Sequence, residues 1–276
     1  MMFSIYLVIS AGLTVFLSNF FNILREDYSW WLVPLLLVGF TLVFLIIHFL
    51  LVVLIILTTN LNKPPKNAFF FRLLLKSGLP ILFKILRVKI ETEGIEKLPE
   101  DGKMLFVCNH QHDFDPAVII STFPDSHIAF IGKKDIYTEM PFIARAMHRL
   151  QCLPIDREND REAAKTIIKA IKMLKENEAS IGLFPEGYTS KTAELLPFRN
   201  GSLKIALKSG ADIAVCVIDG MKGIHKRLFI KKSVVHFRLL DVIESEQYKD
   251  MNTNELGDII HTKMENALNE IRNKVS

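Results

Sequence analysis

The sequence predicts an α/β domain, with a mixed and largely parallel sheet flanked by helices, preceded by an N-terminal two-helix transmembrane hairpin. Two observations support this prediction. The first 62 residues contain two long uncharged apolar runs, and from residue 88 onward short apolar runs alternate with amphipathic stretches. We therefore divide the 276 residues into a transmembrane hairpin (1–62), a membrane-surface helical segment (63–90) and a cytoplasmic α/β domain (91–276).

The hairpin is predicted from length and charge. Residues 3–24 and 30–62 carry no Lys, Arg, Asp or Glu over 22 and 33 residues, whereas about 20 apolar residues suffice to cross a membrane. Trp30 and Trp31 follow the polar loop 25–29 and suit the membrane interface. A cleaved signal peptide fits poorly because no basic residue precedes the first run, which leaves a buried core hairpin as the alternative. We expect a multi-pass membrane protein with two spans.

Positive charge predicts the orientation. Residues 63–90 contain seven basic residues and no acidic one, whereas the loop 25–29 has one Arg and two acids. By the positive-inside rule, everything after residue 62 lies in the cytoplasm. The apolar segments 69–76 and 79–87 are too short to span, so they are expected either in the lipid headgroup layer or packed as a helix pair on the domain. Membrane lipid is therefore an expected partner.

The domain after residue 88 is predicted from its alternating pattern. Helical periodicity is clear at 164–174 and 256–271. Strands alternating with helices favour a parallel sheet covered on both faces, with chemistry at the strand ends. The expected strands are 88–91, 104–108, 127–132, 153–155, 180–184, 213–218 and 234–239.

The three cysteines, Cys108, Cys152 and Cys216, each lie inside an apolar run and are widely spaced. This pattern predicts buried, reduced thiols in a cytosolic domain. It does not fit a disulfide framework or a zinc site.

The segment NHQHDFDP, residues 109–116, has three interpretations. Asp115 before Pro116 suits a helix N-cap, which would make His110 an ordinary polar residue. His110, His112, Asp113 and Asp115 are possible metal ligands, although so short a loop needs further ligands to surround one ion. The third interpretation is proton transfer, with a carboxylate fixing the tautomer of a basic histidine.

Proton transfer requires His110 and Asp115 to meet across the turn. No Ser or Cys elbow stands nearby as a covalent nucleophile, and Cys108 ends an apolar strand, where packing is its expected role. The nucleophile would then be the hydroxyl of a substrate. Taken alone, His-x4-Asp leaves the three interpretations open.

Two later blocks complete a pattern. A Lys133-Lys134 segment leads through Pro141-Phe142 to Ile155-Asp156-Arg157, and Phe184-Pro185-Glu186-Gly187 follows. With Asn109-His110-x4-Asp115, these three blocks in this order resemble the glycerolipid acyltransferases, in particular the 1-acylglycerol-3-phosphate acyltransferases. The resemblance extends over about residues 66–240.

The resemblance implies a membrane-bound acyltransferase that moves an acyl chain from a thioester donor to the free hydroxyl of 1-acylglycerol-3-phosphate, giving phosphatidate in phospholipid synthesis. His110, oriented by Asp115, would be the catalytic base, and a backbone donor near Gly187 or after His110 would hold the oxyanion. The donor would be acyl-CoA or acyl-carrier protein, with no metal or other cofactor and no nucleic-acid partner. The implied substrate-binding residues are Arg157 for phosphate, Glu186 and Gly187 near the acceptor, and Lys133 or Lys134 for added positive charge.

The sequence departs from the family where Tyr188-Thr189 replaces the usual Thr-Arg, so a phosphate-contacting arginine is absent. Lys191 or Arg199 are candidate substitutes. This leaves another lysophospholipid as the alternative acceptor. A metal-dependent hydrolase and a non-catalytic lipid-binding protein are the alternative classes.

One basic run lies outside these blocks. Residues 222–232 contain five Lys or Arg residues and one His. A solvated hairpin is the simplest interpretation. Contact with anionic lipid, with the phosphates of coenzyme A or with an acidic carrier protein is the alternative.

Overall fold

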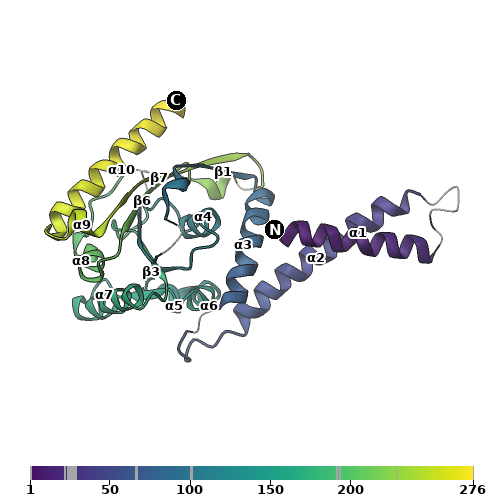
Figure 1. The fold of residues 1–276 in the computed structure, drawn as a ribbon, viewed down its shortest axis with the longest axis horizontal. Coiled ribbons are helices and arrows are strands. Elements are labelled where there is room, and N and C mark those ends of the chain that lie inside the picture. The colour runs from purple at the N-terminus through teal and green to yellow at the C-terminus, as the bar shows by residue number, and fades with distance from the viewer. Residues whose placement is uncertain are drawn as a thin grey trace.

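The computed structural model describes residues 2–21, 23, 30–65, 68–99, 102–190, 192, 194–227 and 229–275. The predicted loop at 25–29 lies outside them. Figure 1 shows an α/β body from which a pair of helices projects. The helices are α1 (Met2–Phe20), α2 (Leu32–Leu57), α3 (Phe69–Ile85), α4 (Asp115–Thr122), α5 (Ile136–Glu139), α6 (Pro141–Arg149), α7 (Asp160–Lys175), α8 (Lys204–Ser209), α9 (Ser245–Tyr248) and α10 (Thr253–Val275).

The described residues form a sheet of seven strands in the order β1-β7-β6-β2-β5-β3-β4. Every neighbouring pair is parallel except β6 and β7, which are antiparallel. The predicted mixed, largely parallel sheet is confirmed. The strands are β1 (Val88–Glu93), β2 (Leu105–Cys108), β3 (Ile128–Lys133), β4 (Leu153–Ile155), β5 (Ser180–Leu183), β6 (Ile213–Asp219) and β7 (Ser233–Ile243).

Both faces of the sheet are covered, because side chains of one strand alternate between two cores. Leu105 and Val107 of β2 belong to the core that includes residues of α7 and α10. Phe106 and Cys108 belong to the opposite core, formed with α3 and α4. A strand buried on both faces has no polar position of its own, so polar chemistry is left to the residues that follow it.

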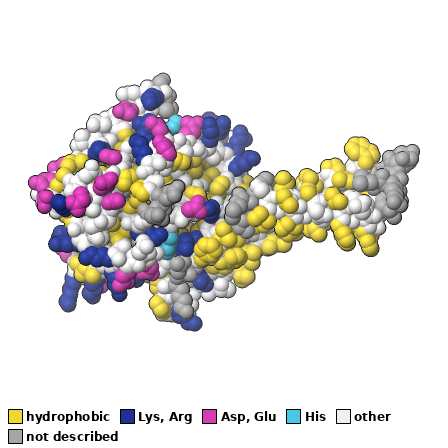
Figure 2. Space-filling model, in the orientation of Figure 1, with side chains coloured by type: hydrophobic (Ala, Val, Ile, Leu, Met, Phe, Trp, Pro, Cys, Tyr) yellow, Lys and Arg dark blue, Asp and Glu magenta, His cyan; other side chains and the backbone are white. Residues whose placement is uncertain are grey.

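Helices α1 and α2 lie side by side and project from the body (Figure 1), with an apolar surface along much of their length (Figure 2). Within the described residues, only α2 is both long and apolar enough to cross a membrane; the described part of α1 is shorter. A polar chain joins the pair to α3. The Tyr6 hydroxyl lies 2.8 Å from His48 Nδ1, and His48 Nε2 lies 3.1 Å from the carbonyl oxygen of Leu74.

Segments 69–76 and 79–87, expected as separate helices, form the single helix α3. Pro80 lies inside it. Proline removes the hydrogen bond that its own nitrogen would donate, and its ring crowds the carbonyl group four residues earlier. The helix nevertheless continues because Phe71, Leu74, Leu79 and Phe83 are all buried on one side of it, and this packing outweighs the local break. The expectation of two short helices was therefore wrong.

Candidate active site

The candidate active site lies at the carboxyl ends of parallel strands. His110 follows β2, segment 184–187 follows β5, and Arg157 follows β4. In a parallel sheet these ends share one edge, where loops bring together residues from distant parts of the chain. The three sequence blocks therefore meet at one edge of the fold.

His110 and Asp115 form a hydrogen-bonded pair. His110 Nδ1 lies 2.8 Å from Asp115 Oδ2, and Asp115 is fully buried whereas the His110 side chain is 16% exposed. The imidazole ring also stacks on Phe184, with the ring centroids 4.3 Å apart. When the carboxylate accepts a hydrogen bond from Nδ1–H, Nε2 carries no proton and can take one from a bound group. No described residue hydrogen-bonds to Nε2, which lies on the opposite edge of the ring.

Asp115 also organises the loop before its helix. Its Oδ2 accepts hydrogen bonds from the backbone N–H groups of Gln111 at 2.6 Å and His112 at 2.9 Å. Both residues precede α4, and Phe114 occupies the cap position of that helix. The N-cap interpretation of Asp115 is therefore wrong. The carboxylate accepts hydrogen bonds from the loop that carries His110, and not from N–H groups of the first helical turn.

Glu186 holds the His110 loop from the other side. It is 3% exposed, and its two oxygens accept hydrogen bonds from the backbone N–H groups of His110 at 2.6 Å and Leu196 at 2.8 Å. The Ser190 N–H donates to the His110 carbonyl oxygen at 2.8 Å. Burial raises the pKa of Glu186 to about 7, against the lowering effect of its two backbone donors. Because both oxygens bind backbone, an effect of Glu186 on the acceptor would pass through the His110 loop.

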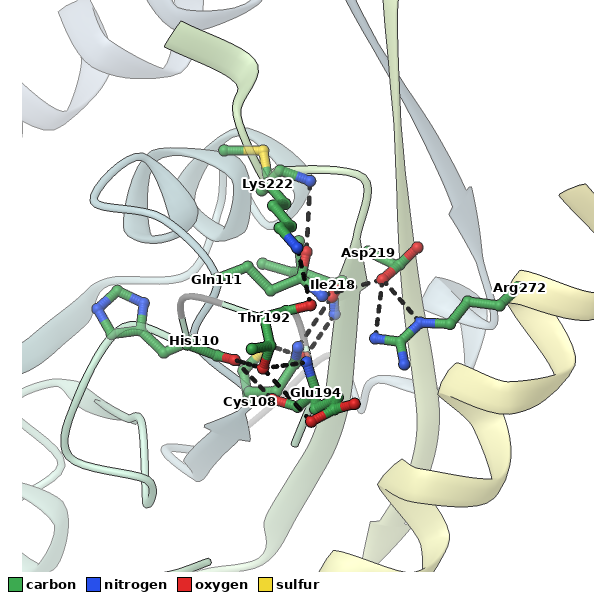
Figure 3. A network of polar contacts seen from close by, with 12 residues as sticks. Cys108, His110, Gln111, Thr192, Glu194, Ile218, Asp219, Lys222 and Arg272 are labelled. Carbon is green, nitrogen blue, oxygen red and sulfur yellow. Dashed lines mark hydrogen bonds and ion pairs between the residues drawn. The ribbon is translucent and has the colours of Figure 1, made fainter. Parts of the chain in front are cut away.

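Two amide side chains that sequence reasoning did not single out anchor the same loop. Asn109 is buried and pairs with the backbone of Ile218 like an added strand residue, through bonds of 2.9 and 2.7 Å. Gln111 Nε2 donates to Asp219 Oδ1 at 2.9 Å, and Arg272 lies 3.2 Å from the same oxygen. In Figure 3 the His110 ring points away from this network. The sequence signal was present: two amides directly after a fully apolar strand must find buried partners.

Two arginines lie close to the Tyr188 ring. The guanidinium carbons of Arg157 and Arg199 lie 5.1 and 4.9 Å from the centre of its ring, and Arg199 Nη2 donates to the Tyr188 hydroxyl at 2.9 Å. Burial lowers the pKa of Arg157, and the neighbouring Arg199 adds to that effect. The two guanidinium groups therefore create a positive site beside Gly187.

The backbone conformation at position 187 and the nearness of Arg199 favour glycine there. The φ of Gly187 is +77°, and a Cβ at this position would lie 3.1 Å from Arg199 Cδ. Any other residue would strain the turn and displace Arg199. The Gly187 N–H itself donates to the Phe184 carbonyl oxygen at 3.1 Å, so it closes the turn.

A groove of about 600 Å³ extends from the two arginines along α7. Arg157, Arg199 and Gly187 line one part of it. The rest is largely aliphatic and includes Ile131, Ile155, Ile167, Ile171 and Leu183. A positive mouth on an apolar groove suits a ligand with an anionic head and a hydrocarbon tail.

Lys133 and Lys134 lie apart from that groove and bind carboxylates. Lys133 forms an ion pair with Asp135, which raises the lysine pKa, and Lys134 Nζ lies 3.2 Å from Asp156 Oδ2. Both lysines are at least half exposed. Their proposed contact with phosphate stays a prediction.

The alternative chemistries find little support in the geometry. Within the described residues, no group of three or more His, Cys, Asp or Glu side chains is arranged to hold a metal ion. The three cysteines are free and buried, as predicted. Burial raises the pKa of Cys108, and a thiol kept protonated is a poor nucleophile. The arrangement is suited to removing a proton from a bound hydroxyl.

Comparison with known proteins shows a similarity to acyltransferases. The Acyltransferase family model matches residues 89–219. The 1-acyl-sn-glycerol-3-phosphate acyltransferase of Borreliella burgdorferi is 28% identical over 70% of this chain and 78% of that protein, and the Escherichia coli enzyme of the same name is 28% identical over 68% and 76%. A chloroplastic enzyme of Arabidopsis thaliana is 32% identical over 48% of this chain and 36% of its own. The crystal structure of a 1-acyl-sn-glycerophosphate acyltransferase from Thermotoga maritima shares the fold, with a TM-score of 0.63 at 20% identity over 83% of this chain and 90% of that one. Residues 89–219 of this chain are therefore similar to the acyltransferase family.

Proposed function

We propose that this protein transfers an acyl chain from a thioester to the free hydroxyl of 1-acylglycerol-3-phosphate and so forms phosphatidate. The observation that carries the proposal is the pairing of His110 Nδ1 with the buried Asp115 at 2.8 Å. This pairing leaves Nε2 as the base for a substrate hydroxyl. The names of the relatives described above point to the same acceptor.

The reaction proceeds by direct transfer. His110 Nε2 takes the proton of the acceptor hydroxyl while its oxygen attacks the thioester carbonyl, so a carbon–oxygen bond forms. When the tetrahedral intermediate collapses, the carbon–sulfur bond breaks and the leaving thiolate takes the proton from His110. Asp115 stabilises the imidazolium that exists between these two steps. The step needs no metal or other cofactor.

Arg157 and Arg199 bind the phosphate of the acceptor. A guanidinium group can offer two parallel N–H donors to phosphate oxygens, and two such groups flank Tyr188 here. Arg199 would thereby replace the arginine that Tyr188-Thr189 lacks. If the phosphate were esterified, Tyr188 would be the side chain that a larger headgroup meets, which keeps another lysophospholipid as the alternative acceptor.

The groove beside these arginines receives a hydrocarbon chain, because the part formed by Ile131, Ile155, Ile167, Ile171 and Leu183 is aliphatic. The acyl donor is acyl-CoA or acyl-carrier protein. Both present the same thioester to His110.

The protein is anchored by α1 and α2 with its catalytic domain on the cytoplasmic side. Seven basic residues and no acidic one at 63–90 support this orientation. We propose that both helices cross the membrane and that α3 lies at its surface, where Phe69 and Phe70 are 69% and 54% exposed.

The test is product formation by the purified full-length protein in detergent micelles. Lysophosphatidate is supplied with acyl-CoA or acylated carrier protein in the presence of EDTA. We expect phosphatidate from the wild type and none from His110→Ala. Asp113→Asn changes an exposed carboxylate of the same loop and is expected to keep full activity. Inhibition by EDTA, or activity in His110→Ala, would refute the proposal.

A further inference from the structure

Two segments without acidic residues meet at one corner of the domain. Residues 63–90 and 220–240 contain no Asp or Glu. The parallel pairing of β1 with β7 brings them together. Backbone N–H groups of Phe229 and Ser233 donate to the carbonyl oxygens of Leu86 at 3.4 Å and Arg87 at 2.9 Å. The fold thus concentrates positive charge from two distant parts of the chain.

An exposed apolar tip stands at this corner. Phe229 is 63% exposed and Ile230 is 72% exposed, and Ile85, next to Leu86, is 59% exposed. Single exposed apolar residues are ordinary, but a contiguous group rimmed by charge marks an interaction surface. We call Ile85, Phe229 and Ile230 the apolar tip.

The loop that carries the apolar tip is firmly held. Met221 and Ile224 are buried in the core. Arg227 Nη2 donates to the carbonyl oxygens of Gly220 at 3.1 Å and Lys222 at 2.8 Å. Met221, Ile224 and Arg227 thus anchor the described segment that precedes Phe229.

A basic groove of about 760 Å³ lies beside the tip. Lys84, Arg87, Lys89 and Lys232 line it, and no carboxylate does. Lys89 binds Glu91. No acidic side chain in the described part of the chain lies within ion-pair distance of Lys84, Arg87 or Lys232. Figure 2 shows Lys and Arg side chains gathered at the corner where α3 meets β1.

The corner lies beside the projecting helices. Figure 1 shows α3 standing across the inner end of the α1–α2 pair. The apolar tip lies at the end of α3 that leads into β1, because Phe229 bonds to Leu86 there. We propose that this corner is a further membrane contact, beyond the α1–α2 anchor and the exposed start of α3. The apolar tip enters the acyl boundary of the leaflet, and Lys84, Arg87 and Lys232 bind the phosphates of anionic lipid headgroups. Apolar burial and attraction to anionic lipid then act together.

The experiment places an environment-sensitive fluorophore at the tip of the full-length protein in vesicles. Ile230→Cys is labelled with NBD, and Glu265→Cys, on an exposed position of α10, is the matched control. The native cysteines are buried, so the label goes to the introduced thiol. Vesicles contain phosphatidylcholine alone or with phosphatidylglycerol, and nitroxide-bearing lipids report contact between fluorophore and membrane. Label incorporation into the unsubstituted protein measures the background.

We expect blue-shifted emission and nitroxide quenching at position 230 in anionic vesicles, weaker quenching in phosphatidylcholine, and neither effect at position 265. Lys84→Gln with Lys232→Gln in the labelled protein should lower the equilibrium constant for docking by roughly fivefold per charge removed. Equal solvent exposure at both labels would overturn the proposal. Protection of the 230 label by soluble acyl-carrier protein, without quenching by lipid, would assign the corner to an acidic protein and also overturn it. The readout is independent of product formation, so a failure here leaves the proposed acyl transfer standing, and a loss of transfer leaves this result intact.

Discussion

Asp115→Asn tests the central pair most directly, because it removes a charge and changes little else. Asn can keep an oxygen where Oδ2 accepts from His110 Nδ1 and the two backbone N–H groups. Its amide nitrogen would occupy the place of Oδ1, which has no hydrogen-bond partner within the described residues. The new nitrogen therefore meets no opposing donor, and the fold should survive.

The magnitude follows from the separation of the charges. With Nδ1 and Oδ2 2.8 Å apart, the centres of an imidazolium and a carboxylate lie about 4 Å from each other, which corresponds to about 4 kcal/mol at an effective dielectric constant of about 20. Losing most of this stabilisation in the transition state lowers kcat by about 10²–10³-fold. Steady-state phosphatidate formation measures kcat, and Asp113→Asn is the control. A fall of less than about fivefold would show that the carboxylate does not stabilise charge on His110.

Three further predictions concern Glu186, Arg199 and His48. The pKa of Glu186 rises from 4.5 to about 7 on folding, so the folded state binds this proton more tightly than the unfolded state does. The free energy of unfolding is therefore highest below pH 4.5 and falls by about 3 kcal/mol as the pH rises to about 7. Glu186→Gln should flatten this slope in chemical unfolding followed between pH 5 and 7, and an unchanged slope would contradict the assignment. Arg199→Gln should raise KM for lysophosphatidate by about tenfold, as expected for one lost hydrogen bond to a charged group, while KM for the thioester stays constant; a rise in both would point to general disruption. His48→Leu removes the bonds to Tyr6 and to the α3 backbone and should lower the unfolding free energy in detergent by about 1–2 kcal/mol, with Tyr6→Phe giving the smaller loss.

The strands were predictable because each is a short apolar run bounded by polar residues. All seven were located, and β4 was predicted with its observed bounds, Leu153–Ile155. The end of β7 was missed because Asp241 interrupts its apolar run: the strand continues to Ile243, where it pairs with Ile213. Pairing with a distant strand, not local pattern, decides where such a strand ends.

The candidate site was predictable in its residue types and less so in its connections. His110 and Asp115 lie five positions apart, so their meeting across a turn could be foreseen. Glu186 was assigned to the acceptor, yet its two oxygens bind the backbone at His110 and Leu196. The bond of Asn109 to Ile218 joins residues 109 positions apart. Such contacts depend on the order of strands in the sheet, which periodicity does not determine.

The two ends of the loop 221–232 connect the reactive loop with the membrane contact we propose. At one end the Met221 N–H donates to Gln111 Oε1 at 3.3 Å, and the rings of His225 and His112 lie 6.0 Å apart. At the other end the Phe229 N–H donates to the carbonyl oxygen of Leu86, the residue after α3. Because buried side chains hold the loop in between, docking of its tip would set the distance of His110 from the leaflet. A lysolipid acceptor keeps its tail in the bilayer and offers its hydroxyl near the headgroups, so the depth at which the domain sits decides whether Nε2 can reach that hydroxyl. Charge at the corner would then affect kcat/KM for an acceptor presented in vesicles and leave that for a short-chain, water-soluble acceptor unchanged.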